Sequence, residues 1–164
     1  MSKTKFLVYW DPYEEDRFSW ANYFLDLFEK EPHVVTIDLK NNKDPRSQSI
    51  LREADLVVVF LRQDENCLDK YFIHDLVRNE NVIYVITDYL YDGLKDWPRI
   101  LERYRIPKSE LFVLPFSHRL QLVSGQDGLH KVIDEESRNT PYEMTVGFSK
   151  SYRMLREKIY QSLR

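Results

Sequence analysis

The segment Asp55–Leu61 constrains the fold of this chain more than any other part of the sequence. It reads DLVVVFL and is apolar without interruption after its first residue. A strand that faces water on one side alternates apolar and polar residues, whereas an unbroken run is typical of a strand buried on both faces. Such strands lie in the centre of parallel sheets covered by helices. The segment therefore predicts an α/β fold with this strand at its centre.

Four further strand-like segments alternate with helical patterns along the chain. The predicted strands cover residues 5–10, 33–39, 55–61, 82–87 and 111–114. The predicted helices cover residues 14–30, 47–53, 67–78, 94–104 and 148–163. Strands that alternate with helices indicate a parallel sheet with helices on both faces. We therefore predict a Rossmann-like three-layer sandwich with a mostly parallel sheet of about five strands and a C-terminal helix, in a single α/β domain spanning residues 1–164.

The composition indicates one packed core and limits the kinds of partner that we expect. Of the 164 residues, 43% are hydrophobic and 14% aromatic, which is ample for a folded interior. A formal net charge of -3 gives no reason to expect nucleic acid as a partner. The lone cysteine forms no internal disulfide, and no signal peptide or membrane-length apolar run is present. We expect a cytoplasmic protein with no transmembrane segment.

Glycine is missing where a nucleotide-binding enzyme of this shape needs it. The first 92 residues hold none, and a phosphate-binding loop after the first strand requires glycines and a lysine. The loop Asp11–Ser19 instead contains four carboxylates and a proline, which removes one backbone donor. We therefore predict no P-loop hydrolysis, no bound cofactor and no metal. Capping of a helix N-terminus accounts for the acidic run Asp11–Asp16.

Ligands of open α/β sheets bind beyond the carboxyl ends of the strands. The residues that border such a site in this chain are predicted to be Asp11, Asp38, Arg62, Gln63, Asp64, Asp88, Phe116 and His118. None of them is assigned a catalytic role. The alternative interpretation is that these side chains are polar only because loops face water.

Two other groups of side chains admit a functional and a structural interpretation. Cys67 stands near the start of a predicted helix, which lowers a thiol pKa, but Asp64 nearby raises it, so we interpret the thiol as structural. Tyr84, Tyr89 and Tyr91 cluster around the fourth strand. They are either core residues or an amphipathic patch suited to a partner, and the sequence leaves both open.

The segment Ala54–Asp64 resembles the strand and turn of MinD/ParA-type ATPases of the SIMIBI P-loop class. The most similar branch is the clostridial one near the proteins that localise Tad pili. The matching residues are Leu61, Gln63, Leu68, Asp69, Tyr71 and Phe72. Downstream, Arg103–Lys108 leading into Leu111–Phe116 is similar to a second family segment, and Tyr9–Pro12 and Ser19–Asn22 are similar to the two ends of its P-loop.

The resemblance implies a Rossmann-like fold and a role as an organiser. Family members act as dimers at poles or membranes and recruit other machinery. The glycines and the lysine of the family's loop are absent here, so the resemblance implies a pseudo-ATPase with a degenerate P-loop. The expected function is a non-catalytic interaction or scaffold module, with a protein partner or a second copy of the chain.

Two other functions remain open. A receiver-like signalling domain would use Asp11, Asp64 and Thr87, although no lysine follows the predicted fifth strand. An NAD- or nucleoside-processing enzyme would use a carboxylate near the end of a strand, for which Glu65 or Asp69 is the candidate.

Overall fold

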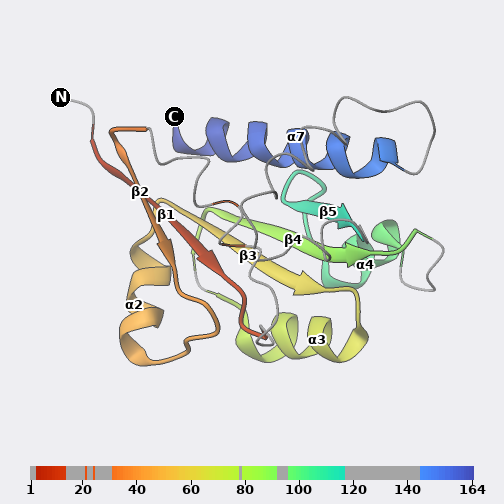
Figure 1. The fold of residues 1–164 in the computed structure, drawn as a ribbon. Helices are drawn as coiled ribbons and strands as arrows, with labels where there is room; N and C mark the ends of the chain where they lie inside the picture. Colours follow the sequence, from red (N-terminus) through yellow and green to blue (C-terminus); the bar gives the residue numbers. More distant parts are fainter. Residues whose placement is uncertain are drawn as a thin grey trace, which may run out of the picture.

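A single parallel sheet organises the molecule. The computed structural model describes residues 3–13, 21, 24, 31–77, 79–91, 96–116 and 145–164. The strands are β1 (Lys5–Trp10), β2 (Val34–Asp38), β3 (Leu56–Arg62), β4 (Val82–Tyr89) and β5 (Leu111–Pro115) (Figure 1). Their order is β2-β1-β3-β4-β5, and each neighbouring pair is parallel. This is the order of the doubly wound flavodoxin-like sheets.

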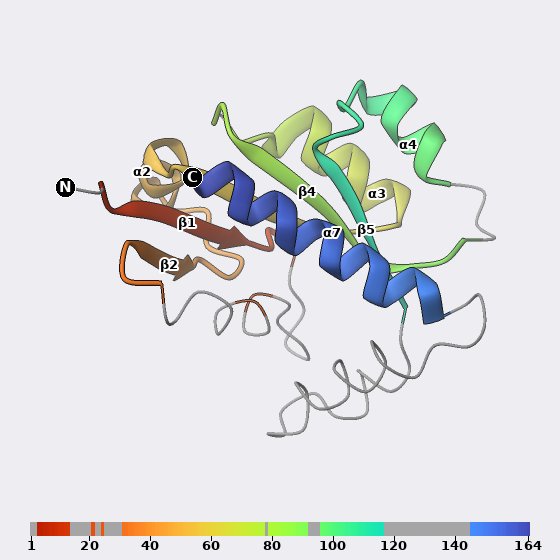
Figure 2. The ribbon, with the colours of Figure 1, turned by 90° about the horizontal axis from the view of Figure 1, so that it is seen from above.

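Helices cover both faces of the sheet. They are α2 (Pro45–Glu53), α3 (Glu65–Asp69) with its continuation as the π-helix η1 (Lys70–Asp75), α4 (Trp97–Tyr104) and α7 (Thr145–Leu163). Figures 1 and 2 show α7 along one face, with α2, α3 and α4 on the other. The predicted Rossmann-like three-layer arrangement with a C-terminal helix is confirmed. Among the described residues, no helix is both long enough and apolar enough to cross a membrane.

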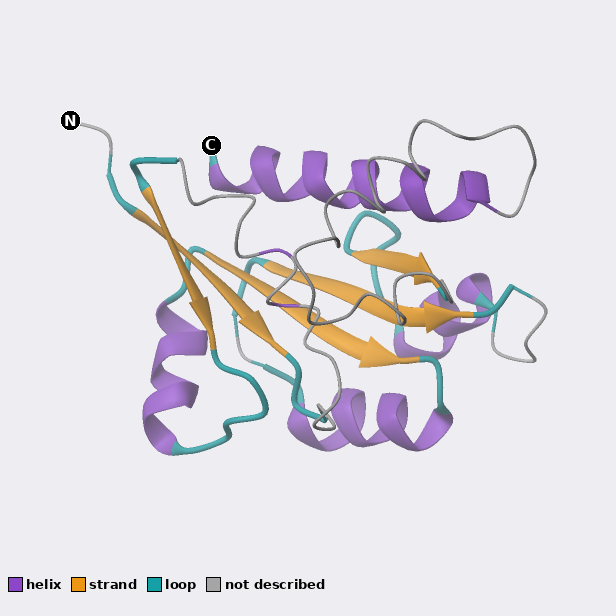
Figure 3. Ribbon diagram, viewed as in Figure 1, coloured by secondary structure: helices purple, strands orange, loops and turns teal. Residues whose placement is uncertain are grey.

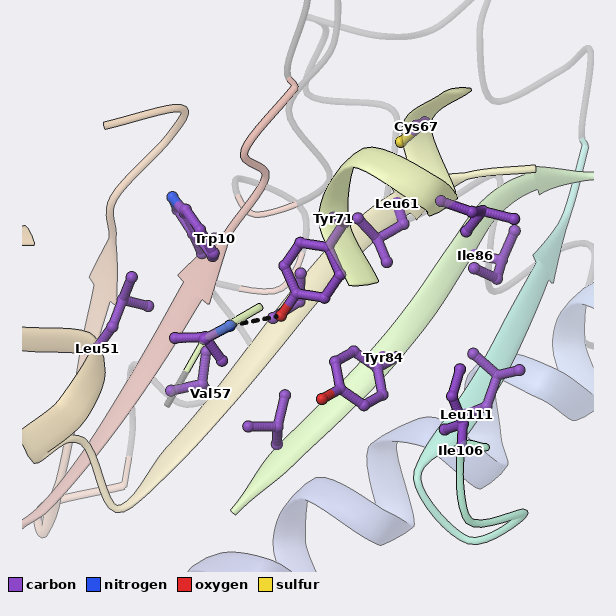
Figure 4. Close-up of a cluster of buried hydrophobic side chains, with 14 of the residues drawn as sticks. Trp10, Leu51, Val57, Leu61, Cys67, Tyr71, Tyr84, Ile86, Ile106 and Leu111 are labelled. Atoms are coloured by element: carbon purple, nitrogen blue, oxygen red, sulfur yellow. Dashed lines mark hydrogen bonds between the residues drawn. The ribbon is translucent and has the colours of Figure 1, made fainter. Parts of the chain in front are cut away.

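Strand β3 is buried on both faces, as its sequence predicts. Leu56, Val58 and Phe60 pack in the core under α7, with Phe148, Leu155 and Ile159 of that helix. The alternate residues Val57, Val59 and Leu61 pack in the second core, under α2, α3 and α4. Figure 4 shows part of this second core around Tyr71, whose hydroxyl accepts a 3.4 Å hydrogen bond from the Val77 N–H.

Two helices begin two residues earlier than predicted, each directly after an aspartate that caps its N-terminus. The helix predicted at 47–53 begins at Pro45, because the Asp44 carboxylate accepts hydrogen bonds from the N–H groups of Arg46 and Ser47. The helix predicted at 67–78 begins at Glu65, because Asp64 caps it in the same way. This helix changes to π-helix and ends at Asp75, so its predicted C-terminal end is wrong.

The segment around β4 also differs from its prediction. The strand runs to Tyr89, two residues beyond the predicted end, and its pairing with β5 is irregular between Ile86 and Tyr89. The helix predicted at 94–104 begins at Trp97, after the capping residue Asp96. Of the helix predicted at 14–30, the structure describes Ala21 and Phe24, which are helical and buried in the core under α7.

Candidate functional site

The carboxyl ends of the five strands meet at one edge of the sheet, as the arrowheads in Figure 3 show. The chain leaves β1 toward β2 on one side, and β3 lies on the other side of β1. Ligands of doubly wound sheets bind at this point, where the direction of winding reverses. The candidate site therefore lies where β1 and β3 end, beside Asp11 and Arg62.

The first residues after β1 use their backbone donors within the protein. The Asp11 N–H donates to the Lys40 carbonyl at 3.1 Å. Pro12 has no N–H. The Tyr13 N–H donates to the Asp11 carboxylate, also at 3.1 Å. In the described part of this loop, residues 11–13, no backbone N–H is left for a phosphate group.

Tyr13 is held in place by the π-helix η1. Its hydroxyl donates a 2.8 Å hydrogen bond to Asp75, and Lys43 donates a second one of 2.8 Å to the same oxygen. The ammonium groups of Lys43 and Lys70 lie 4.5 and 4.9 Å from the centre of the Tyr13 ring. Sequence reasoning missed this cluster, because Tyr13 and Asp75 are 62 residues apart and no local pattern relates them.

The contacts within this cluster change the pKa values of both Asp75 and Tyr13. Burial by itself raises the pKa of Asp75, but hydrogen bonds from Lys43 and Tyr13 outweigh burial and hold this pKa below its ordinary value. Burial and the neighbouring Asp75 carboxylate raise the pKa of Tyr13. At neutral pH the loop after β1 is therefore joined to η1 by a neutral tyrosine and an ionised aspartate.

The turn after β3 encloses the only cysteine. The Asp64 carboxylate accepts a 2.8 Å hydrogen bond from the Cys67 N–H and lies 3.4 Å from Arg62 Nε. The thiol residue is 5% exposed, and burial raises the pKa of Cys67 to about 11, with Asp64 and Asp11 adding to the rise. A buried thiol held in its protonated form is a poor nucleophile, which supports the structural interpretation of Cys67.

Gln63 connects the turns that follow β3 and β4. Its side-chain amide donates to the Leu90 carbonyl at 3.0 Å and accepts from the Leu90 N–H at 2.8 Å. Near the end of β4, Asp88 adopts a left-handed backbone conformation with φ 52°. Burial raises the pKa of Asp88, and the charge of Arg62 opposes this rise. The two turns are therefore fixed to each other at the candidate site.

The remaining predicted site residues lie further out or outside the described residues. Asp38 ends the edge strand β2 and accepts a 2.8 Å hydrogen bond from the Lys40 N–H. Phe116 follows β5 and is exposed. His118 lies outside the described residues. Within the described ranges, no group of three or more His, Cys, Asp or Glu side chains could hold a metal ion.

Three exposed apolar side chains follow directly after β4 and β5. Leu90, Tyr91 and Phe116 are 54%, 61% and 41% exposed, and we call them the β4–β5 patch. The Phe116 N–H donates to the Tyr89 carbonyl at 3.1 Å, and the Tyr89 and Tyr91 rings meet edge to face at 5.0 Å. Tyr84 and Tyr89 are buried. Of the three tyrosines around β4, two are therefore core residues and Tyr91 belongs to a surface patch.

The carboxylates suggested for an enzymatic role form contacts between helices. Arg103 contacts Glu65 at 2.5 Å and both oxygens of Asp69 at 2.9 Å. The Tyr104 hydroxyl donates to Asp69 at 2.6 Å. These contacts join α3 to α4.

The comparisons with known proteins show a likeness of fold. No protein-family model and no curated protein sequence matches the chain. Among solved structures, the chain is similar to the cell division ATPase MinD of Pyrococcus furiosus, with a TM-score of 0.51 and 11% identity over 86% of this chain. The match covers 57% of that protein, so the chain spans little more than half of its length. At this identity the likeness concerns the fold, which is MinD-like.

A second solved structure is more distant. It is an NADPH-quinone reductase from P. pentosaceus, with a TM-score of 0.39, 12% identity, and coverage of 85% of this chain and 99% of that one.

Proposed function

We propose that this chain is a non-catalytic protein-interaction module on a MinD-like fold, in which the position of the phosphate-binding loop is closed. The observation that supports the proposal is the loop after β1. The N–H groups of Asp11 and Tyr13 are used within the protein, and Pro12 has none. A nucleotide phosphate at the crevice would meet a carboxylate in place of the backbone donors that it requires.

The sequence motifs support a particular family for this proposal. The segment Ala54–Asp64 resembles the MinD/ParA-type ATPases, and the fold is similar to MinD. We therefore propose a pseudo-ATPase related to that class, close to the branch that localises Tad pili. Its activity would be to organise a partner protein, without hydrolysis.

The β4–β5 patch is the surface that we assign to the partner. Aromatic side chains are enriched in protein interfaces, and exposed apolar patches mark contact sites. Leu90, Tyr91 and Phe116 lie beside the turns that Gln63 holds together. A partner would therefore meet a preorganised surface.

Two experiments test the proposal. ATP with magnesium is expected to release no phosphate above a buffer blank, and turnover at an ordinary enzymatic rate would contradict the non-catalytic role. The triple variant Leu90→Ser, Tyr91→Ser, Phe116→Ser is expected to lose proteins that co-purify with the wild type from the source cells. Met154→Ser on α7, which is also exposed, is the matched control and should retain them. Unchanged co-purification with the triple variant would rule out the patch.

A receiver-like domain is the second candidate, because the strand order is that of CheY-type domains. The side chains fit it less well. Asp64 is engaged by the Cys67 N–H, and the buried Thr87 hydroxyl donates to the Leu61 carbonyl at 3.3 Å. Pro115 ends β5, where a receiver needs a lysine. Intact-mass analysis after incubation with acetyl phosphate tests this function. We expect no added phosphoryl group.

A further inference from the structure

Strand β2 forms one edge of the sheet. At alternate residues, its backbone N–H and C=O groups point away from the neighbouring strand β1. Lys5 N–H donates to the His33 carbonyl, and Leu39 N–H donates to the Tyr9 carbonyl. Because hydrogen-bonding direction alternates along a strand, the odd-numbered residues of β2 face β1 and the even-numbered ones face outward. In the described part of the chain, β2 is hydrogen-bonded to β1 and to no other strand.

The first four of the five residues of β2 include no charged residue and no proline, and the charged Asp38 ends the strand. Residues Val34–Ile37 read VVTI, with no proline and no charge. Proteins normally protect exposed edges with such residues. The outward N–H of Val34 bonds back to the Glu31 carbonyl at 3.1 Å, but no described bond engages the backbone of Thr36 on its outer side. Beside the edge, Phe6 and Val35 are 43% and 42% exposed.

We propose that a second copy of this chain pairs with β2 in antiparallel orientation, about a two-fold axis at Thr36. Outward residues must face outward residues, so the two copies can pair only in registers that match even-numbered positions. Centring on Thr36 is the symmetric register that pairs all five residues of β2. It places Thr36 opposite its own copy, Val34 opposite Asp38, and Val35 opposite Ile37.

The pairs formed in this register are complementary. The Thr36 residues exchange two backbone hydrogen bonds, and each Asp38 N–H meets the Val34 carbonyl of the other copy. No like charges lie directly opposite each other. Val35 meets Ile37, a β-branched pair of the kind that stabilises sheets. Isologous pairing of this kind closes into a dimer, so it does not propagate into a fibre.

A hollow beside the edge adds room for the second copy. It has a volume of about 210 Å³ and lies between the sheet and α2, lined by Phe6, Ile37, Ile50, Glu53 and Ala54. Because Ile37 lines the hollow and faces Val35 of the other copy, that valine lies at the mouth of the hollow. Figure 2 shows β2 at one edge of the sheet, with α2 set back from it. The two copies of α2 would therefore flank the junction.

This inference rests on the proposed interaction role and names one partner for it. It uses β2, whereas the β4–β5 patch lies on the opposite part of the sheet. Failure of the dimer would leave the tests of the patch and of nucleotide binding unaffected.

A cysteine at the two-fold axis tests the register directly. In a hydrogen-bonded antiparallel pair the Cα atoms lie about 5.5 Å apart, which a disulfide can span. Thr36→Cys is therefore expected to form a disulfide-linked dimer under mild oxidation. Val35→Cys is the matched control, because residue 35 then faces Ile37 and should form little cross-link. Cys67 is buried and should not compete. Equal cross-linking at both positions, or none at Thr36→Cys, would overturn the proposed register.

Light scattering of the native chain across a concentration series tests the dimer itself. We expect a dimer that Thr36→Pro weakens about tenfold or more, because proline removes the outward N–H without breaking a bond to β1. Val35→Lys should have the same effect through charge on the edge, and covers the case in which the proline variant does not fold. Met154→Lys is the control and should leave the dimer intact. A monomer at all concentrations, or a dimer unaffected by both edge variants, contradicts the proposal.

Discussion

The Tyr13 hydroxyl donates a 2.8 Å hydrogen bond to Asp75, which joins the loop after β1 to the π-helix η1. In doubly wound folds that bind nucleotides, this loop holds the phosphates. Here the ring of Tyr13 is close to two ammonium groups, those of Lys43 and Lys70. The described start of this loop, residues 11–13, is therefore stabilised by contacts within the protein.

Replacing Tyr13 with phenylalanine should lower the free energy of unfolding by about 1 kcal/mol at neutral pH, because Asp75 loses one of its two donors. Urea denaturation measures the change. Tyr91→Phe, at an exposed tyrosine, is the control and should have almost no effect. A Tyr13→Phe variant as stable as the wild type would mean that the contact does not anchor the loop.

The effect of Tyr13→Phe should depend on pH. The pKa of Asp75 in the folded state lies below its ordinary value of 3.8. A lowered carboxyl pKa stabilises the fold above the unfolded value and ceases to do so as the pH falls through the folded value. The difference between wild type and variant should therefore shrink below pH 3.8. A constant difference down to pH 2 would contradict an ionised Asp75.

Gln63→Leu should loosen the turn after β4. The variant loses both hydrogen bonds to Leu90, so the Leu90 amide should exchange with solvent about tenfold faster or more, which hydrogen exchange measures residue by residue. Gln48→Leu on α2 is the matched control. If exchange at Leu90 does not change, the turn is held by other contacts.

Asp88→Asn should stabilise the protein at pH 7. Burial raises the pKa of Asp88 in the folded state, so its charged form opposes folding above the ordinary value of 3.8. Asparagine removes this charge and tolerates the left-handed conformation with φ 52°. We expect a gain below about 1 kcal/mol at pH 7 and none near pH 3, where both side chains are neutral. Loss of stability at pH 7 would show instead that the attraction between the Asp88 carboxylate and the charge of Arg62 dominates.

Cys67 should react slowly with iodoacetamide at pH 8. It is buried, and its pKa of about 11 leaves a small thiolate fraction. Ser49→Cys provides an exposed thiol on α2 for comparison. Mass spectrometry should find the added cysteine alkylated at least about a hundredfold faster. Comparable rates would mean that Cys67 is accessible and activated, and would reopen an enzymatic role.

The local pattern of the sequence is sufficient to predict the elements of the fold. The unbroken run at β3 indicates a strand buried on both faces, and both faces are covered. The local pattern does not predict the order of the strands in the sheet, because that order depends on contacts between segments that are far apart in the sequence. Helix ends also escaped prediction. The capping residues are Asp44, Asp64 and Asp96. Other polar residues lie near each of them in the sequence, so the sequence alone does not select which one caps the helix.

The candidate site could be predicted only in outline. The rule that ligands bind beyond the carboxyl ends of strands selected Asp11, Arg62, Asp64 and Asp88, and the structure brings these residues to one edge. It gave no indication that Tyr13 contacts Asp75, since that contact joins segments remote in sequence. The same rule selected Gln63 as a site-border residue, but it did not indicate that the Gln63 amide bonds to the backbone N–H and carbonyl of Leu90.

The most direct test of the closed loop is a thermal-shift series with ATP, ADP, GTP and NAD, each with and without magnesium. A ligand that binds only the folded state at about one hundred times its Kd stabilises it by about 2.7 kcal/mol, which raises the Tm by several degrees. We predict no shift with any of the four nucleotides. A clear, magnesium-dependent shift with ATP would contradict the account, because the loop at Asp11 and Tyr13 would then have to open and bind phosphate.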